Sequence, residues 1–427
     1  MRLNRPFKQD TQMTIIKNIT DNLSSKCNLK IIRPTFYKTP PDGKIIKQNP
    51  VYIYDYKNAV DIIDETKPDI ILVMSSYELT GIAFSVAANK KNIPVVKIYE
   101  WKPDYYDDFD TKDLIKAKTL TAFSKNAFED ITGQKPKIFS NYIFMFKKFQ
   151  FLFKTLIKCD YSFFDIFRLL FLFFNSVISK NDMKIQKKFQ GDLNICATND
   201  WISKLSEIGF QKSTLTFTGS CIFDKLYSKK RISKSNSKIK RILFCPSPMH
   251  GYGYWSKKKE DDLIINTVNE ILKSNSYDLS IKLHPASHNI DEFKELSNNF
   301  LKKITIFQNE DLLELLLSYD AVITYGSSSL GLYSHIIQIP LIQIIHDGSD
   351  LKYNLFYNEK LSILCKEPKK IVSNIDELEN FKPSENDYEN FYKEFLGKFD
   401  GKSSERMAYA ILKLLNYDTF NSSLNKA

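Results

Sequence analysis

The sequence is poor in the residues that build metal centres and disulfide frameworks. Among 427 residues there are six cysteines and five histidines, and no cysteine pair has the spacing of metal ligands. The cysteines stand far apart and mostly in apolar runs, which is typical of reduced core residues in a cytosolic protein. They are Cys27, Cys159, Cys196, Cys221, Cys245 and Cys365.

Targeting and membrane-spanning patterns are missing as well. The first residues include Arg2 and Arg5 but no apolar centre of a signal peptide, so we do not expect export. A spanning helix needs about 20 consecutive apolar residues. The longest apolar run, Leu169–Phe174, is far shorter, and the sequence predicts a cytoplasmic protein without a transmembrane helix.

The composition is otherwise that of a folded protein with excess positive charge. An apolar fraction of 43% and a charged fraction of 26% are ordinary, and the length favours two domains of roughly 150–220 residues each. The formal net charge of +11 indicates an anionic partner: nucleic acid, anionic lipid, or a phosphorylated or acidic substrate. Because the lysines are scattered among 50 acidic residues and no nucleic-acid-binding motif occurs, we expect no nucleic acid.

The first half of the chain alternates predicted strands and helices. The run Lys67–Met74 predicts a strand buried on both faces of a parallel sheet, a helix follows over about Leu79–Lys91, and Ile93–Tyr99 completes a β-α-β unit. Glu78 and Glu100 follow the two strands. Open α/β sheets bind ligands at this edge, so both carboxylates are candidate catalytic bases. A cap for a neighbouring helix, or a partner for a lysine, is the structural alternative.

Residues 104–113 are acidic and aromatic and include the sequence Asp108-Phe109-Asp110. Two aspartates at this spacing could hold a divalent metal for a nucleotide-sugar. Three-residue acidic matches are frequent, however, and a solvated loop explains them equally well. We therefore expect no metal.

The stretch from Ile143 to Ile178 differs sharply in composition, with 11 of the chain's 32 phenylalanines. Their spacing suits amphipathic helices with a very large apolar face. Two interpretations stay open: a helical hairpin that lies on an anionic membrane surface, or a pair of core or dimer-contact helices. The basic residues interleaved with the phenylalanines are Lys147, Lys148, Lys154, Lys158 and Arg168.

A Ser- and Lys-rich tract over residues 228–240 has no apolar period and is the predicted linker. After it, Arg241–Cys245 predicts a buried strand, followed by a loop that contains Ser247, His250 and Gly251. The loop resembles a phosphate loop, although it has neither the dinucleotide fingerprint nor the Walker pattern. Its residues are candidate nucleotide ligands, and a plain surface histidine is the alternative for His250.

Two further strand ends carry polar residues. A short apolar strand over Ile281–Leu283 delivers His284 to its carboxyl end, where ligands bind. The strand Ala321–Thr324 leads through a tight turn at Gly326 into a helix that starts on three serines, Ser327, Ser328 and Ser329. Unpaired backbone N–H groups and the positive end of the helix dipole make such a start a phosphate seat. We predict that both strand ends meet in one nucleotide-binding cleft; a histidine packed beside Pro285 is the structural alternative.

Taken together, these motifs resemble the GT-B superfamily. The resemblance rests on the turn Thr218-Gly219-Ser220, the pair His284-Pro285, the serine-rich helix start and a final helix at Asp400–Arg406. The chain is most similar to bacterial capsule and surface-polysaccharide transferases, including polysialyltransferases and CDP-glycerol glycerophosphotransferases, and the similarity is best over residues 193–415. In those families the His-Pro and Ser-rich motifs hold the nucleotide phosphates, which implies that role for His284 and for Ser327, Ser328 and Ser329.

The resemblance implies an α/β fold of two facing Rossmann-like domains with parallel sheets. The first would span residues 1–227 on the acceptor side, with the Phe-rich helical insertion at 143–178, and the linker would span 228–240. Residues 241–400 would bind the donor nucleotide. Residues 401–427 would form a C-terminal helix and tail that pack back toward the first domain.

The resemblance also implies an activity: metal-independent, inverting transfer of a nucleotide-activated sugar, or of a glycerophosphate-type group, onto a cell-surface glycan. His284 and the serines would stabilise the leaving phosphate, with Glu100 as the first candidate base and Glu78 as the second. The expected partners are the nucleotide-sugar donor, a glycan or lipid-linked acceptor and an anionic membrane surface. The expected location is the inner face of the cytoplasmic membrane, with no cofactor.

Two other functions stay open. The non-hydrolysing UDP-N-acetylglucosamine 2-epimerases share the architecture and the Thr-Gly-Ser-like turn. They carry a Gly-Gly pair followed by paired glutamates where this chain has Ser328, Ser329, Leu332 and Tyr333. A non-catalytic binding protein with a degenerate GT-B fold is the second alternative.

Overall fold

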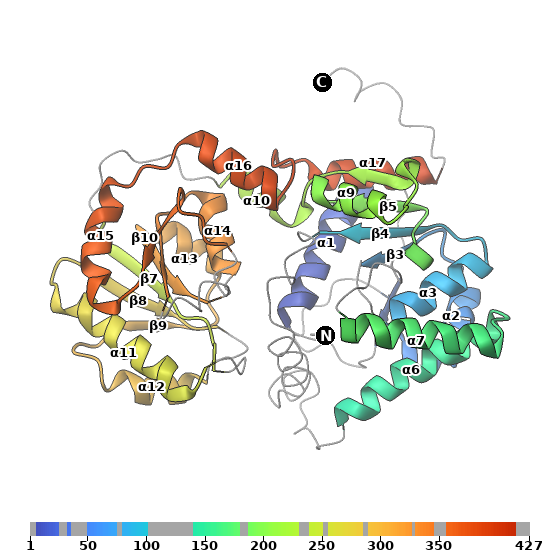
Figure 1. The fold of residues 1–427 in the computed structure, drawn as a ribbon, viewed down its shortest axis with the longest axis horizontal. Helices are drawn as coiled ribbons and strands as arrows, with labels where there is room; N and C mark the ends of the chain where they lie inside the picture. Colours follow the sequence, from blue (N-terminus) through green and yellow to red (C-terminus); the bar gives the residue numbers. More distant parts are fainter. Residues whose placement is uncertain are drawn as a thin grey trace. The chain divides into compact units, whose positions relative to one another are not determined.

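Short runs of β-branched and other apolar residues form the strands of two parallel sheets (Figure 1). The computed structural model describes residues 6–24, 32–35, 49–74, 79–100, 140–179, 187–229, 239–250, 255–284, 289–326, 329–345 and 356–415. These residues form two compact units. Of the described residues, those up to 224 and from 393 onward belong to the N-terminal unit, and those from 225 to 392 belong to the C-terminal unit.

Four parallel strands form the sheet of the N-terminal unit, in the order β3-β4-β5-β6. They are β3 (Ile71–Met74), β4 (Val95–Tyr99), β5 (Leu193–Cys196) and β6 (Leu215–Phe217), and β1 (Ile32–Thr35) pairs separately with β2 (Asn49–Tyr52). The interior strand β4 is buried throughout. β3 lies at an edge of the sheet, where Leu72 is 36% exposed, so the prediction that this strand is buried on both faces was wrong.

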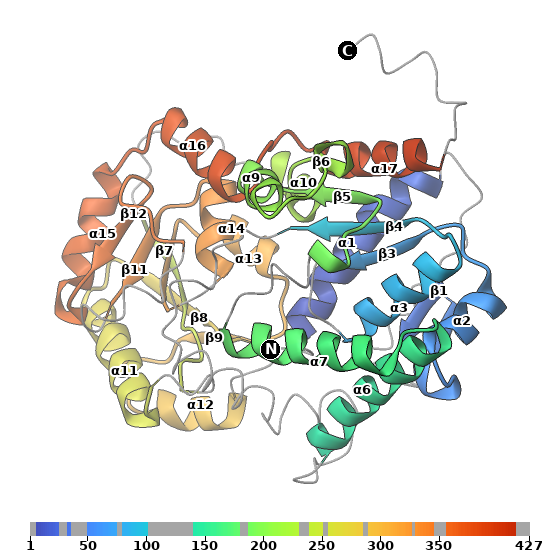
Figure 2. The same cartoon turned by 45° about the vertical axis from the view of Figure 1, so that its right-hand side comes forward.

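Helices cover both faces of this sheet (Figure 2). On one face, α1 packs against α17 over Val96 and Ile195; on the other, α2, α3, α6 and α7 pack over Val73 and Val95. The bounds are α1 (Pro6–Ser24), α2 (Ala59–Thr66), α3 (Leu79–Lys90), α6 (Ser140–Lys158), α7 (Phe163–Ser179), α9 (Asn199–Glu207), α10 (Asp224–Tyr227) and α17 (Ser403–Leu414). The final helix predicted after Asp400 is therefore present, and it belongs to the N-terminal unit.

The Phe-rich stretch forms the helix pair α6 and α7, as predicted. Their inner sides belong to the core of the N-terminal unit, with Phe151, Leu156 and Leu169 buried. The Thr155 hydroxyl accepts the backbone N–H of Ala59 at 3.0 Å, which ties α6 to the start of α2. In the described part of the chain, no helix has the length and apolar character needed to cross a membrane.

Six parallel strands form the sheet of the C-terminal unit, in the order β12-β11-β10-β7-β8-β9. They are β7 (Arg241–Cys245), β8 (Asp278–Lys282), β9 (Thr305–Phe307), β10 (Ala321–Tyr325), β11 (Leu341–Ile344) and β12 (Ser362–Cys365). The helices α11, α12 and α15 lie on one face, and α13 and α14 lie on the other (Figure 1). Their bounds are α11 (Lys257–Lys273), α12 (Ile290–Ser297), α13 (Leu312–Ser318), α14 (Ser329–Ile337) and α15 (Ile371–Asn380), and α16 (Glu385–Phe395) follows.

The cysteines that the structure describes are buried and unpaired with one another, as the sequence predicted. These are Cys159, Cys196, Cys221, Cys245 and Cys365. Burial raises the pKa of the Cys196 and Cys245 thiols to about 12. Both are therefore core thiols without nucleophilic character at neutral pH.

Candidate functional site

The strand order of the C-terminal unit reverses at the centre of its sheet. β7 lies beside β10, while the chain continues from β7 to β8 and β9 on one side, and from β10 to β11 and β12 on the other. In open α/β sheets, ligands bind outside the carboxyl ends of the strands at such a reversal. Two of the predicted ligand residues lie at these strand ends: Ser247 is the second residue after β7, and Gly326 is the first after β10.

Gly326 brings the chain after β10 against the loop after β7. Its φ of +68° lies in the left-handed region that favours glycine. A β-carbon at this position would lie 2.5 Å from the Met249 sulfur and 3.3 Å from the Ser247 β-carbon. Both the backbone conformation and the close approach therefore require glycine. The structure places Ser247 and Gly326 side by side, as a shared site requires.

Glu260, in the first turn of α11, holds the same loop from the other side. Its Oε1 accepts the Met249 backbone N–H at 3.0 Å and the Tyr325 hydroxyl at 3.2 Å, and its Oε2 accepts the His250 backbone N–H at 2.9 Å. Burial raises the pKa of the Glu260 carboxyl, and the three donors oppose that rise. One buried carboxylate thus ties the loop after β7 to the last residue of β10. Glu260 was not among the residues predicted from the sequence; its signal was an acid in the first turn of the helix after a candidate phosphate loop.

Aromatic packing completes this anchor. The Trp255 ring stacks on the Tyr325 ring, with centroids 5.3 Å apart, and the Lys259 ammonium lies 4.5 Å from the centroid of Trp255. The His250 side chain is exposed, and its Nδ1 lies 3.2 Å from the Trp255 carbonyl oxygen. The backbone N–H of His250 is fixed by Glu260, and the role of its side chain as a nucleotide ligand stays a prediction.

His284 lies half-buried at the carboxyl end of β8, the neighbour of β7. Nearby, the buried Lys282 donates from Nζ to the carbonyl oxygens of Leu283 at 3.1 Å and Gln308 at 2.6 Å. Burial lowers the pKa of Lys282. These bonds tie together the ends of β8 and β9, and they fix the backbone from which His284 projects. The sequence showed Lys282 only as part of the His-Pro motif, so its contribution was missed.

α14 begins at Ser329, three residues after Gly326, which confirms a helix after the tight turn. Several of the candidate residues lie outside the described part of the chain: Glu78, Asp108–Asp110, Gly251, Ser327 and Ser328. Their roles, together with the expectation of a metal-free site, stay predictions.

Glu100, the first candidate base, belongs to the N-terminal unit and follows β4. It is 4% exposed, its Oε2 accepts the Ser220 hydroxyl at 2.7 Å, and its Oε1 accepts the Cys221 thiol at 3.3 Å. Burial raises the pKa of Glu100 to about 7, despite the opposing effect of these hydrogen bonds. Both donors come from the segment that includes the Thr-Gly-Ser turn. The turn and the glutamate were both predicted from the sequence, but their contact with each other was not.

The C-terminal helix closes around the same turn. The Asp224 carboxylate accepts the backbone N–H groups of Ser403 at 3.1 Å and Ser404 at 2.7 Å, the first two residues of α17. Arg406 donates from Nε to the Thr218 carbonyl at 2.7 Å, and its Nη1 donates to both carboxylate oxygens of Asp400 at 2.9 and 2.8 Å. The predicted final motif therefore supports the turn that holds Glu100.

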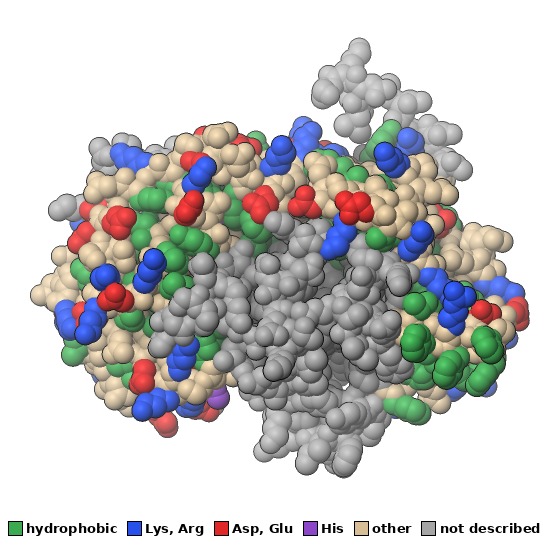
Figure 3. Space-filling view, viewed as in Figure 1, with side chains coloured by type: hydrophobic (Ala, Val, Ile, Leu, Met, Phe, Trp, Pro, Cys, Tyr) green, Lys and Arg blue, Asp and Glu red, His purple; other side chains and the backbone are tan. Residues whose placement is uncertain are grey.

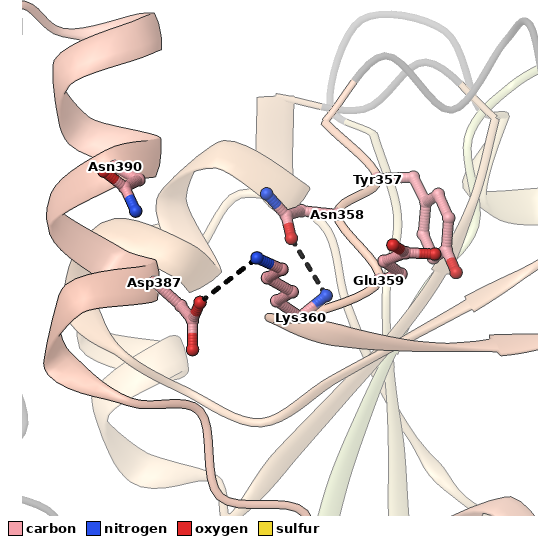
Figure 4. Close-up of a pocket in the computed structure, with 6 residues that line it drawn as sticks. All are labelled: Tyr357, Asn358, Glu359, Lys360, Asp387 and Asn390. Atoms are coloured by element: carbon pink, nitrogen blue, oxygen red, sulfur yellow. Dashed lines mark hydrogen bonds and ion pairs between the residues drawn. The ribbon is translucent and has the colours of Figure 1, made fainter.

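A hollow of about 390 Å³ lies elsewhere in the C-terminal unit (Figure 4). The Lys360 ammonium lies 3.9 Å from the Asp387 carboxylate there. Most of the lining residues precede β12 and lie at the amino ends of the strands, whereas open α/β sheets bind ligands at the carboxyl ends. We therefore do not assign this hollow to the site. Its lining residues are Tyr357, Asn358, Glu359, Lys360, Asp387 and Asn390.

Solved structures are similar to nearly the whole chain, although no protein-family model matches it and no curated protein matches its sequence. A UDP-N-acetylglucosamine 2-epimerase is 12% identical with a TM-score of 0.53, over 97% of this chain and 96% of that chain. The enzyme from Methanocaldococcus jannaschii is 13% identical with a TM-score of 0.51, over 94% and 96%. The enzyme from Neisseria meningitidis, bound to UDP-GlcNAc, is 13% identical with a TM-score of 0.50, over 94% and 96%. The chain has the GT-B fold.

The GT-B assignment confirms the predicted α/β class with two parallel sheets and a Phe-rich helical pair. At identities of 12% to 13%, the likeness concerns the fold alone. The fold does not separate transfer from epimerisation.

Proposed function

We propose that the protein is a metal-independent, inverting GT-B transferase that moves a nucleotide-activated sugar, or a glycerophosphate-type group, onto a cell-surface glycan. The observation that supports this most is the strand reversal at β7 and β10, where the loop held by Glu260 lies against the tight turn at Gly326. The start of α14 would offer backbone N–H groups to the donor phosphates. His284, at the end of the adjacent strand, would stabilise the charge on the departing phosphate.

The sequence of α14 favours transfer over epimerisation. The helix contains no Asp or Glu, and Leu332 is buried where the resemblance places a glutamate of the epimerases. Tyr333 is largely buried as well, and burial raises its pKa, so its hydroxyl stays protonated at neutral pH. An epimerase acting here would have to draw its acid and base from elsewhere. The epimerase remains the second candidate, because the similar structures carry that name.

Glu100 is the proposed base that deprotonates the acceptor hydroxyl, with Glu78 as the second candidate. A pKa of about 7 suits a general base at neutral pH, because an appreciable fraction is ionised while the carboxylate stays basic enough to take a proton. The Ser220 and Cys221 donors hold the carboxylate in one orientation and leave lone pairs on both oxygens for a further partner.

The base of the donor nucleotide can be identified by thermal shift with CMP, CDP, UDP and GDP. A ligand that binds only the folded protein stabilises it by about 2.7 kcal/mol at a hundredfold excess over Kd. We expect one of the four nucleotides to raise Tm clearly above the other three. No shift with any nucleotide would favour the non-catalytic GT-B alternative.

Product analysis separates transfer from epimerisation. The matching nucleotide-sugar is incubated with the protein, with and without a glycan acceptor, and the products are separated by anion exchange. We expect no change in the sugar without acceptor, and release of nucleotide with it. Conversion of the donor to its 2-epimer in the absence of acceptor would replace our proposal with the epimerase.

Replacing His284 by alanine tests the leaving-group role. We expect transfer to be abolished while far-UV circular dichroism and Tm stay close to wild type, because the side chain is only half-buried at a strand end. Lys360→Ala, in the hollow at the amino ends of the strands, is the matched control and should leave turnover unchanged. Undiminished turnover in His284→Ala would remove His284 from the mechanism.

We also propose a place for the reaction, the inner face of the cytoplasmic membrane. A growing surface glycan, or a lipid-linked precursor of it, would be presented there to a protein of the cytoplasm.

A further inference from the structure

The outer face of α7 consists largely of exposed phenylalanine. Four residues at helical spacing point away from the core of the N-terminal unit, with exposed fractions of 64% to 86%: Phe163, Phe164, Phe167 and Phe171. Figure 3 shows hydrophobic side chains gathered over this part of the molecule, with Lys and Arg side chains beside them. Monomeric soluble proteins rarely expose so much contiguous apolar surface without a binding partner.

The exposed side of α6 adds to this surface. Phe146 and Ile157 are 66% and 54% exposed. Exposed basic residues stand among the apolar ones on both helices: Lys147, Lys154, Lys158 and Arg168. We refer to these ten residues together as the aromatic-basic face.

The helices themselves are firmly seated, so the exposure does not reflect a loose packing of the hairpin. The opposite sides of α6 and α7 are buried in the core, at Leu152, Leu156 and Ile166. The turn between the helices is pinned by an ion pair of Asp160 with Lys90 on α3, and α7 is capped by Ser162, whose hydroxyl accepts the Asp165 N–H at 3.1 Å. Packing in the core thus accounts for the apolar residues on one side of each helix. It does not account for the apolar residues of the aromatic-basic face.

We propose that the aromatic-basic face binds the surface of an anionic lipid bilayer, with α6 and α7 lying in the interfacial plane. Phenyl rings at the boundary of head groups and acyl chains gain by leaving water, and basic side chains among them pair with lipid phosphates. A second copy of the chain fits the face less well. Its four cations would be brought against those of the first copy, with only Asp160 and Asp165 on the described hairpin to offset them.

This inference supplies the surface for the membrane location within the proposed function, but it does not need the proposed reaction. Lipid binding is measured without donor or acceptor. If the protein binds bilayers but transfers nothing, the proposed reaction has failed. If it transfers to a soluble acceptor without binding bilayers, the proposed lipid surface has failed.

The test is co-sedimentation of the full chain with vesicles of equimolar phosphatidylcholine and phosphatidylglycerol, and with vesicles of phosphatidylcholine alone. We expect strong binding to the anionic vesicles, weak binding to the neutral ones, and a steep loss of binding as salt is raised. Each of Phe163→Ser, Phe164→Ser and Phe167→Ser should lower partitioning by about tenfold or more, because each removes an apolar side chain that the bilayer would bury. Lys154→Glu and Arg168→Glu should lower binding to anionic vesicles only.

Two control variants lie in the C-terminal unit. Leu301→Ser removes an apolar side chain of 58% exposure, and Lys369→Glu reverses an exposed charge; both should bind vesicles like wild type. All Phe variants should keep the wild-type Tm because the rings are exposed. Wild type that stays in the supernatant with anionic vesicles, or binding unchanged by the Phe substitutions, would overturn the proposal. Wild-type dimers that the Phe substitutions convert to monomers, without vesicle binding, would assign the face to a second copy.

Discussion

The fold raises the pKa of the Glu100 carboxyl to about 7, which is close to neutral pH. Burial disfavours its charged form, while the Ser220 hydroxyl and the Cys221 thiol favour it, and burial wins. The nearby Asp224 adds a smaller effect in the same direction as burial. The ionised form of Glu100 therefore costs stability.

The pH dependence of stability follows with a definite sign. The usual pKa of 4.5 rises to about 7 in the folded protein, so the unfolded chain releases its proton first and stability falls from about pH 4.5 to pH 7. Glu100→Gln mimics the protonated form. Its free energy of unfolding, relative to wild type, should grow across this window by up to about 3 kcal/mol and stay constant above it. Urea unfolding between pH 5 and pH 8 measures this.

The exposed Glu207→Gln, on α9 of the same unit, is the control and should run parallel to wild type. If Glu100 is also the base, Glu100→Gln should lose transfer, and wild-type kcat should rise with pH to a plateau above about 7. A constant stability difference between Glu100→Gln and wild type across the window would refute the shifted pKa.

Glu260 makes the second prediction at this scale. Glutamine has one acceptor oxygen, so Glu260→Gln cannot serve the Met249 and His250 N–H groups on separate oxygens as the carboxylate does. We expect a loss of about 1–3 kcal/mol in urea unfolding, together with weaker nucleotide binding by thermal-shift titration. Asp262→Asn, exposed on the same helix, should change neither. Wild-type nucleotide affinity in Glu260→Gln would confine this residue to a purely structural role.

These residues also show what the sequence could reveal. His284, Gly326 and Glu100 were predictable because each follows an apolar β-rich run, and the ends of parallel strands meet at one edge. The residues that contact them were not predictable from the sequence. Ser220 and Glu100 are 120 residues apart in the sequence. Met249 lies against Gly326 because β7 and β10 are neighbours in the sheet. Such pairings depend on strand order, which hydrophobic periodicity does not encode.

Helices and strands with a clear hydrophobic pattern in the sequence were predicted correctly. Elements of mixed composition were not. The strand Arg241–Cys245 was predicted with its observed bounds, and the helix predicted over about Leu79–Lys91 spans Leu79–Lys90. α11 begins with three lysines capped by Ser256, so its first turn shows no apolar stripe in the sequence. The sequence analysis did not predict three elements that lie between the serine-rich helix start and the final motif at Asp400–Arg406, namely β12, α15 and α16. The exposure of β3 was missed because a strand's place in its sheet is a tertiary property.

The docking of α17 supports a prediction for a single element. Asp224 supplies what a helix start needs: a negative charge near the positive end of the dipole, and acceptors for the N–H groups of Ser403 and Ser404. Asp224→Ala removes both and should cost about 1–2 kcal/mol in urea unfolding. Asp200→Ala, exposed in the first turn of α9 without such a bond among the described contacts, should cost less. Equal losses in both variants would contradict the proposed cap.

At the scale of the whole molecule, the chain has two units with separate cores, and the proposed nucleotide site lies in one of them. The hydrophobic cluster under β7–β12 belongs to the C-terminal unit, and the clusters around β3–β6 belong to the N-terminal unit. A ligand that binds one unit stabilises that unit first, by mass action. The heat unfolding of such a chain need not be a single transition.

Hydrogen exchange with and without the nucleotide identified by thermal shift should therefore give a localised result. We expect slower exchange in peptides that carry the ends of β7, β8 and β10, around Ser247, His284 and Gly326, because these backbones would contact the phosphates or the loop that holds them. Peptides from the hollow around Asn358 and Lys360 should exchange as before, since this hollow lies at the amino ends of the strands. Protection centred on that hollow would move the nucleotide to the opposite edge of the sheet. Transfer could then no longer be attributed to His284 or to the start of α14.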